Sequence, residues 1–253
     1  MSWFEHGEAR VYYEESGAGA PLLLLPGWAG SIDELAPIRA ALEGRYRVIA
    51  ADLPGSGKSA PQPRTFTPQY LEEDAKTFLA LLDELRAAPA HLVGFSDGGE
   101  YALLMAATRP EVARSVVTWG AAGSLGTNTQ MADAMTTLID DPIPPMAGFA
   151  EFLKAAYGED NARIMTRSAG QAFRAIMDTG GDVSRSRAER ITAPALLITG
   201  EHDFLATPDL VADMAAAIPN GTFVKAADAS HPVHHEQSEW LTRTIAGWLS
   251  ERS

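Results

Sequence analysis

The sequence predicts an α/β protein built on a mostly parallel, doubly wound sheet. Short apolar runs alternate along the chain with segments of helical periodicity. The runs are continuously apolar rather than alternating, as expected of strands that helices cover on both faces. At 253 residues, the chain is long enough for one such domain with a large buried core and an insertion.

The apolar runs and the turn-forming residues that end them predict the order of the strands and helices. Strands are expected at 10–14, 22–25, 46–51, 91–95, 115–119, 195–199 and 222–224. Helices are expected at 32–42, 68–86, 99–108, 208–218 and 238–250. The four leucines of the second strand run into Pro26-Gly27, and the third strand runs into Asp52, which are turn-forming residues at a strand end.

The alternation of strand and helix stops between about residues 121 and 190. Two or three helices are expected here, interrupted at Asp141–Pro145, where prolines forbid a helix. Five of the eight methionines fall in this segment, and methionine fills adaptable apolar surfaces. We expect a helical lid at 121–190 over a core formed by 1–120 and 191–253. A packed helical subdomain without a gating role is the alternative.

The most informative stretch is Gly94-Phe95-Ser96-Asp97-Gly98-Gly99, which lies between an apolar run and a helix-prone run. This places Ser96 at the tip of a sharp strand–turn–helix connection. The glycines two residues to either side stand where a side chain would clash with the folded backbone. The spacing is that of a nucleophile elbow. The elbow puts the hydroxyl at a helix N-terminus, where unpaired N–H groups favour negative charge.

A serine hydroxyl becomes a useful nucleophile when a base takes its proton and an acid holds that base. With this motif, the acid follows a later strand and the histidine comes last. Asp203 follows the apolar run at 195–199, and His231 follows the strand at 222–224. We predict a catalytic triad of Ser96, Asp203 and His231. Taken singly, such an Asp is usually a turn residue and such a His is usually packed or exposed.

Other histidines compete for the role of base. His202 directly precedes Asp203 and is expected to point away from it, and His234 and His235 fall near the last helix, beyond the loop. The spacing of His231, His234 and His235 is not a standard zinc signature, so no metal site is expected. Gly55-Ser56-Gly57-Lys58-Ser59 lacks the first glycine of a phosphate-binding loop and is expected to form a structural turn.

Two backbone N–H groups are needed to stabilise an oxyanion. We predict the N–H of Asp97, directly after the nucleophile, and the N–H of Trp28, in the glycine-containing loop after the strand at 22–25. The Trp28 side chain either lines the acyl pocket or packs over the sheet edge. These roles require no cofactor.

Composition limits the partners. The net charge of −13 argues against binding to nucleic acid or to anionic membranes. The chain has no cysteine, hence no disulfide framework, and its apolar runs are too short to span a bilayer. No signal peptide is visible at the start of the sequence. We expect a cytoplasmic monomer or small homo-oligomer that acts on a small-molecule ester.

Several motifs carry a family resemblance. Leu-Pro-Gly at 25–27, Asp-Leu-Pro-Gly-Ser-Gly at 52–57 and Gly-Glu-His-Asp at 200–203 resemble the α/β-hydrolase fold superfamily from about residue 10 to residue 248. Within it, the elbow, Val-Thr-Trp-Gly-Ala at 117–121 and Ala-Tyr-Gly at 156–158 resemble the valacyclovirase (biphenyl hydrolase-like) family. That resemblance implies hydrolysis of α-amino acid esters, with Asp97 contacting the substrate's α-ammonium group.

The residues themselves leave the role of Asp97 open. A carboxylate beside an oxyanion hole opposes the developing charge unless it points away or a cation neutralises it. Capping of the following helix is the other role that suits this position.

The predicted function is hydrolysis of small carboxylic esters, including α-amino acid esters, through an acyl-enzyme. Carbon–carbon bond hydrolysis, lactone opening and perhydrolysis use the same triad and are alternatives. A ligand-binding protein without catalytic activity on the same fold is a further alternative.

Overall fold

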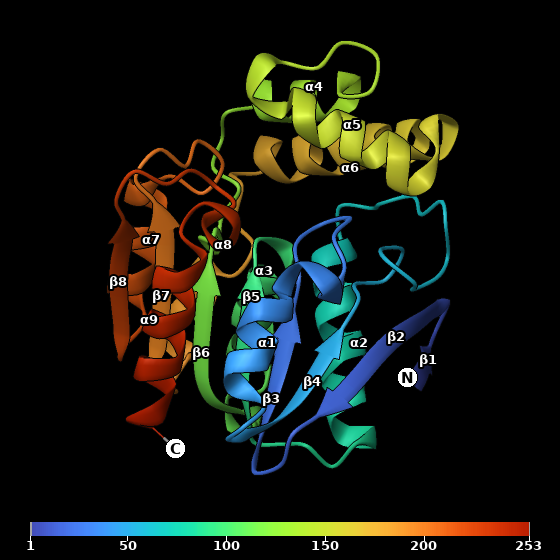
Figure 1. Ribbon diagram of the computed structural model, residues 1–253. Helices are drawn as coiled ribbons and strands as arrows, with labels where there is room; N and C mark the ends of the chain where they lie inside the picture. The colour runs from blue at the N-terminus through green and yellow to red at the C-terminus, as the bar shows by residue number, and fades with distance from the viewer. Residues whose placement is uncertain (1, 253) are drawn as a thin grey trace.

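The computed structural model describes residues 2–252, and its centre is an eight-stranded sheet (Figure 1). The strands are β1 (Ser2–His6), β2 (Ala9–Ser16), β3 (Ala20–Leu25), β4 (Tyr46–Ala51), β5 (Ala90–Phe95), β6 (Ala113–Trp119), β7 (Ala195–Gly200) and β8 (Gly221–Ala226). Their order is β1-β2-β4-β3-β5-β6-β7-β8. All neighbours from β4 to β8 are parallel, whereas β2 is antiparallel to both β1 and β4. The predicted fold class is confirmed.

Helices cover both faces of the sheet. Helices α1 (Ala36–Leu42) and α9 (Ser238–Ser250) pack on one face, and α2 (Tyr70–Glu84), α3 (Asp97–Thr108) and α7 (Pro208–Ala217) pack on the other. The four leucines of β3 show why its sequence does not alternate. Leu22 and Leu24 belong to the first apolar layer, Leu23 and Leu25 belong to the second, and all four are buried.

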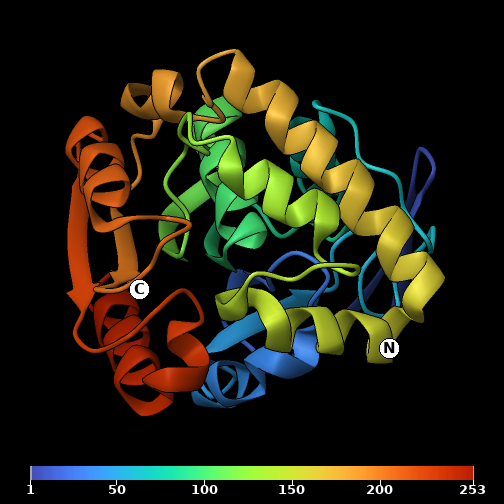
Figure 2. The ribbon, with the colours of Figure 1, turned by 90° about the horizontal axis from the view of Figure 1, so that it is seen from above.

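Three helices lie between β6 and β7, above the C-terminal edge of the sheet: α4 (Gln130–Thr137), α5 (Ala147–Tyr157) and α6 (Glu159–Asp178). Seen from above, they cover the middle of the molecule (Figure 2). The proline-rich break falls between α4 and α5, as predicted. The two ends of the insertion are tied together, because the Gly123 carbonyl accepts hydrogen bonds from the N–H groups of Val183, Ser184 and Arg185.

The structure differs from the sequence prediction at several elements. Strand β1 was not predicted, because an exposed edge strand needs no apolar run. The predicted helix at 32–42 is a 3-10 turn at Ile32–Leu35 followed by α1, with Pro37 in the first turn of α1. Helix α3 begins at Asp97, two residues earlier than predicted. The short helix α8 (Val233–Glu236) was also missed. Within residues 2–252, no helix combines the length and apolarity needed to cross a membrane.

Candidate active site

Ser96 stands at the tip of the turn between β5 and α3. Its backbone has φ 50° and ψ −118°, a conformation that L-residues rarely adopt. A Cβ at Gly94 would lie 2.2 Å from the Gly98 carbonyl oxygen, and one at Gly98 would lie 2.4 Å from the Pro26 carbonyl oxygen. Both glycines are therefore required for the close approach of three backbone segments, as the sequence predicts.

The structure brings Ser96, His231 and Asp203 together from three separate loops. The His231 Nε2 atom lies 3.0 Å from Ser96 Oγ, and Nδ1 lies 2.8 Å from Asp203 Oδ2. A carboxylate only accepts hydrogen bonds, so Nδ1 carries the proton and Nε2 accepts from the serine hydroxyl. Gly120 gives the imidazole its space, because a Cβ there would lie 2.8 Å from His231 Cε1.

The Asp203 carboxylate is held by three N–H donors. Oδ1 accepts hydrogen bonds from the N–H groups of Leu205 (2.8 Å) and Ala206 (3.0 Å), and Oδ2 accepts the one from His231 Nδ1. The Thr199 hydroxyl lies 3.1 Å from Oδ2 and 2.7 Å from the Ala206 carbonyl, so its single proton is shared between the two acceptors. The Asp203 side chain is fully buried. This arrangement stabilises a buried carboxylate and fixes its direction.

One of the two predicted oxyanion donors, Asp97, lies in the elbow, and the other, Trp28, lies in the loop after β3. Neither the N–H of Trp28 nor the N–H of Asp97 has a hydrogen-bond partner among the described residues. The Asp97 N–H is free because the first turn of a helix has no carbonyl to bind. The carbonyl of Gly27 accepts the N–H of Gly30 (3.0 Å), so the trans peptide turns the N–H of Trp28 in the opposite direction.

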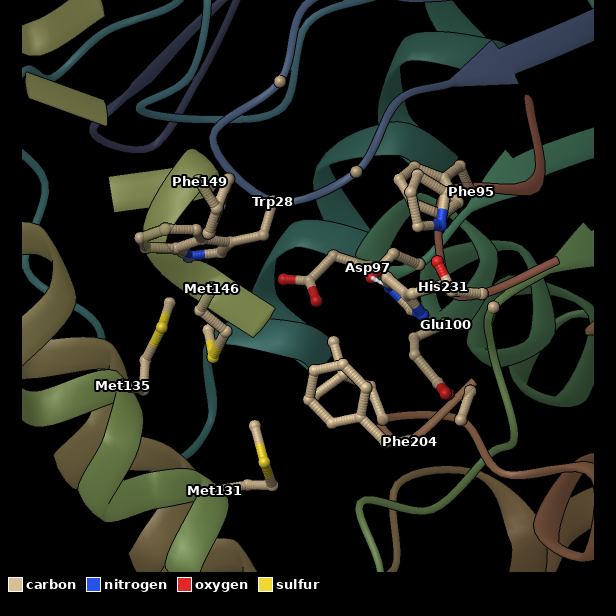
Figure 3. Close-up of a pocket in the computed structure, with 18 of the residues that line it drawn as sticks. Trp28, Phe95, Asp97, Glu100, Met131, Met135, Met146, Phe149, Phe204 and His231 are labelled. Carbon is tan, nitrogen blue, oxygen red and sulfur yellow. Dashed lines mark hydrogen bonds between the residues drawn. The ribbon is translucent and has the colours of Figure 1, made fainter. Parts of the chain in front are cut away.

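The Asp97 side chain does not cap α3. Its Oδ2 accepts a hydrogen bond from the Tyr70 hydroxyl (2.9 Å), and it makes no hydrogen bond to a backbone N–H of the described residues. Figure 3 shows the carboxylate pointing into the cavity, toward the space between Trp28 and Met146. Burial raises its pKa to about 7; the Tyr70 hydrogen bond opposes this shift and the nearby Asp74 adds to it.

The Trp28 side chain lies between the sheet edge and the lid. Its ring packs against Phe66 (centroids 5.5 Å apart) and against Phe149 of α5 (6.0 Å). The buried indole Nε1 has no hydrogen-bond partner among the described residues. Trp28 also lines the cavity, so the two roles predicted for it, pocket lining and packing, coexist.

A cavity of about 630 Å³ opens above Ser96 between the sheet edge and the lid. The lid contributes mainly apolar side chains, and the core contributes most of the polar ones together with Trp28, Phe95 and Phe204 (Figure 3). The lining residues of the lid are Ser124, Leu125, Met131, Met135, Pro145, Met146, Phe149, Phe152, Phe173 and Met177. The polar core residues include Glu34, Ser96, Asp97, Glu100, His231 and His234.

Glu100 is a cavity residue that the sequence reasoning did not single out. It lies one turn after Asp97 and is 5% exposed. Its Oε1 accepts hydrogen bonds from the N–H groups of Ala122 (2.8 Å) and Gly123 (3.0 Å), so it anchors the start of the lid segment. Burial raises its pKa to about 7. The sequence signal was a lone acid in an otherwise apolar helix.

The other histidines that competed for the role of base lie in different surroundings from His231. His202 is exposed, and its side chain makes no hydrogen bond with the described residues. His234 and His235 lie in α8, close to Glu34, with one ligand atom of each of the three within 4.8 Å of the others. This cluster is not visible in the sequence, because Glu34 lies about 200 residues before the two histidines, in the 3-10 turn at Ile32–Leu35.

The parallel sheet, the elbow and the inserted lid define a protein of the hydrolase class. The chain belongs to the alpha/beta hydrolase family, whose model matches residues 22–244. It is similar to serine hydrolase BPHL of Homo sapiens, with 32% identity over 204 residues, 77% of this chain and 67% of that protein. The same protein of Mus musculus is 27% identical over 246 residues, 94% of this chain and 82% of that protein.

Solved structures agree with this fold. The enol-lactonase from Burkholderia xenovorans LB400 superposes with a TM-score of 0.79 and 25% identity, covering 98% of this chain and 100% of that one. A thermophilic esterase from Thermogutta terrifontis gives a TM-score of 0.74 with 19% identity, covering 96% and 94% of the two chains. The sequence-based resemblance to the hydrolase superfamily is therefore confirmed.

Proposed function

We propose that this alpha/beta hydrolase is a serine esterase that cleaves small carboxylic esters, with α-amino acid esters as its preferred class. One observation carries the proposal. The Ser96 hydroxyl, the His231 imidazole and the Asp203 carboxylate form a continuous hydrogen-bonded chain at the floor of the cavity. This chain supplies the nucleophile, the base and the orienting acid that acyl transfer needs.

The reaction follows from these positions. Ser96 Oγ attacks the ester carbonyl carbon while His231 Nε2 takes the hydroxyl proton. The carbonyl oxygen becomes an oxyanion and accepts hydrogen bonds from the N–H groups of Trp28 and Asp97. His231 then gives the proton to the departing alcohol, which leaves an acyl-enzyme on Ser96. Water, deprotonated by His231, attacks this ester, and Ser96 regains its proton as the acid leaves.

Asp97 gives the preference for aminoacyl groups. Its second oxygen, Oδ1, has no hydrogen-bond partner among the described residues, although Asp97 as a whole is only 8% exposed. A bare anion beside the oxyanion hole would oppose the transition state. A substrate ammonium group at Oδ1 would neutralise this charge, lower the raised pKa of Asp97 and hold the α-carbon next to Ser96.

The lid side of the cavity receives the alcohol part of the ester. Methionine and phenylalanine side chains dominate this wall, and such residues adapt to apolar groups of different shape. We therefore expect tolerance toward the alcohol and discrimination at the acyl group.

A matched pair of substrates tests the role of Asp97: one alcohol esterified to L-valine and the same alcohol esterified to isovalerate. We expect the wild type to favour the valine ester in kcat/KM by about 10- to 100-fold, the range of one charge-assisted contact. Asp97→Asn should remove most of this preference and leave isovalerate hydrolysis within about threefold of the wild type. Because the carboxyl group must be ionised and the substrate's α-amino group must be protonated, the preference should grow as the pH rises toward about 7 and fall again at higher pH, where the ammonium group loses its proton.

The matched control is Glu100→Gln, which changes a second buried carboxyl group in the same cavity wall. It should keep the preference for the valine ester. Equal cleavage of the two esters by the wild type would remove the amino acid ester class and leave a general esterase.

Lactone opening is the second candidate, favoured by the similarity to the enol-lactonase structure. A lactone differs from an open ester only in that its leaving alcohol stays attached to the acyl group. Rapid cleavage of lactones with slow cleavage of both open esters would select this candidate. Failure of a fluorophosphonate to label folded protein would instead favour a role in binding.

A further inference from the structure

We propose that Glu34 and His234 are positioning residues for the oxyanion hole. They hold the loop that carries the N–H of Trp28, and neither takes part in proton transfer. The inference rests on the proposed hydrolysis at Ser96 and adds two residues to it.

The Glu34 carboxylate binds the backbone of the oxyanion loop directly. Its Oε1 accepts a hydrogen bond from the N–H of Gly27 at 3.1 Å, one residue before Trp28. The same carboxylate fills the space beside Gly30, where a Cβ would lie 2.2 Å from Oε1. Glu34 thus contacts both ends of the tight turn from Gly27 to Gly30.

His234 approaches the other oxygen of this carboxylate. Its Nε2 lies 3.8 Å from Glu34 Oε2, is buried and has no hydrogen-bond partner among the described residues. On the far side of the ring, Nδ1 accepts a hydrogen bond from the indole N–H of Trp119 at 3.1 Å. An indole nitrogen can only donate, so Nδ1 carries the lone pair and Nε2 carries the proton that faces Glu34.

Phe95 joins this pair to the elbow. Its ring packs on His234 (centroids 4.3 Å apart), on His231 (5.1 Å) and, nearly parallel, on Trp119 (5.7 Å). A Cβ at Gly27 would lie 2.7 Å from the Phe95 ring. The oxyanion loop is therefore held between the residue that precedes Ser96 and the carboxylate of Glu34.

The consequence for catalysis concerns one peptide plane. The N–H of Gly27 is bound by Glu34 and the carbonyl of Gly27 by Gly30, so the orientation of the next N–H, that of Trp28, is set from both sides. Preorganised donors stabilise an oxyanion because they need no rearrangement in the transition state. Loss of the Glu34 anchor should therefore slow the chemical step and leave substrate binding nearly intact.

A metal ion is the competing role for this cluster, because Glu34, His234 and His235 could offer three ligand atoms. The Trp119 bond argues against it. With the lone pair of His234 on Nδ1 and facing a donor, Nε2 has no lone pair to offer a metal. Hydrolysis should be unchanged by EDTA, and activity that requires added Zn²⁺ would overturn the positioning role.

The test compares an uncharged ester with its thionoester, in which sulfur replaces the carbonyl oxygen and fits the oxyanion hole poorly. Glu34→Met keeps the volume and removes the acceptor. It should lower kcat on the ester by about 10- to 100-fold at similar KM, and the ester-to-thionoester ratio should fall by about tenfold. Glu34→Gln, which keeps an oxygen for the N–H of Gly27, should restore kcat to within about threefold of the wild type.

His234→Phe keeps the ring against Phe95 and removes the N–H. It should lower both kcat and the ester-to-thionoester ratio by about three- to tenfold. If Glu34→Met does not fold, this variant tests the positioning role in its place. Asp33→Asn is the matched control, since this exposed acid lies next to Glu34 and makes no hydrogen bond through its side chain to the described residues. It should leave both quantities unchanged.

Two results would overturn the proposal. One is wild-type kcat and an unchanged ester-to-thionoester ratio in folded Glu34→Met and His234→Phe. The other is a change in KM alone. A parallel assay of Ser96→Ala separates this failure from failure of the hydrolase mechanism, because only the latter leaves that variant active. The rate of fluorophosphonate labelling, which uses the same hole, gives a readout independent of the substrate.

Discussion

The two walls of the cavity differ in chemistry and in how firmly they are held. On the core wall, Ser96, His231 and Asp97 take part in side-chain hydrogen bonds, and the turn at Ser96 is fixed by close backbone contacts. On the lid wall, every lining residue of α4, α5 and α6 is a methionine or a phenylalanine. Hydrogen bonds impose direction, whereas apolar contacts impose only volume.

This contrast indicates a division of labour. The reacting atoms must be held to within a fraction of an ångström, and the core wall meets that demand with loops anchored at strand ends. The lid wall meets a weaker demand, since methionine can repack around different groups. Substitutions on the core wall should therefore change rate constants strongly, and substitutions on the lid wall should change affinities modestly.

The largest effect should come from Ser96→Ala, which removes the only group on either wall that the mechanism makes a nucleophile. We expect kcat to fall by about 10⁴-fold or more. Fluorophosphonate labelling should disappear, and the melting temperature should stay close to that of the wild type.

Ser124→Ala is the control, because Ser124 also lines the cavity but donates its hydroxyl hydrogen bond to the carbonyl of Gly181. Its kcat should stay within about fivefold of the wild type. Ester hydrolysis that survives in Ser96→Ala above a buffer blank would contradict the mechanism.

The second effect concerns the free energy of unfolding, which the buried carboxyl group of Asp97 on the core wall should lower at neutral pH. Burial raises its pKa from 3.8 to about 7 in the folded state. Below the unfolded pKa, both states hold the proton and there is no cost. Between pH 3.8 and about 7, the unfolded chain releases the Asp97 proton before the folded protein does. The free energy of unfolding therefore falls as the pH rises through this range, by at most about 4 kcal/mol above pH 7.

Asp97→Asn stays neutral and keeps an oxygen for the Tyr70 hydroxyl. It should therefore be more stable than the wild type at pH 8 and equal to it near pH 4. Chemical denaturation at several pH values between 4 and 8 measures this difference. Asp33→Asn, at an exposed site, should give a small difference that does not depend on pH. A constant offset for Asp97→Asn would mean that the carboxyl group is ionised throughout.

The part of the site that could be predicted from sequence is the part that depends on local backbone geometry. A Cβ at either glycine flanking Ser96 would lie less than 2.5 Å from a backbone carbonyl oxygen, so the spacing of the glycines indicates the turn directly. Asp203 and His231 each follow an apolar strand, and parallel strands end at one edge of the sheet. Proximity of the three residues was therefore predictable before any side chain was placed.

What could not be predicted depends on contacts between distant segments. The role of Glu34 depends on its contacts with the N–H of Gly27 and with His234, which follows about 200 residues later in the chain. The sequence left Asp97 as either a helix cap or a cavity residue, and the Tyr70 hydroxyl, from α2, decides its direction. For the lid, the sequence indicated its helices, its proline-rich break and its composition, but not which side chains face the cavity.

The smallest effect should come from the lid wall, through Phe149→Ala. Phe149 packs edge-on against Trp28 and parallel to Phe152. Its truncation removes contact area from the alcohol side, worth about 1 kcal/mol. We expect KM for an ester of a bulky apolar alcohol to rise by about three- to tenfold, with a smaller rise for the methyl ester and little change in kcat.

Ile164→Ala is the matched control, because Ile164 is exposed on α6 and does not line the cavity. It should leave KM unchanged for both esters. A fall in kcat for Phe149→Ala on the methyl ester would break the division between the walls, since it would show that the lid reaches the oxyanion loop through the Trp28 ring and helps to hold the reacting atoms. This ring contact adds to the hydrogen bond that the Tyr157 hydroxyl, at the end of α5, donates to the carbonyl of Ala29 at 2.7 Å.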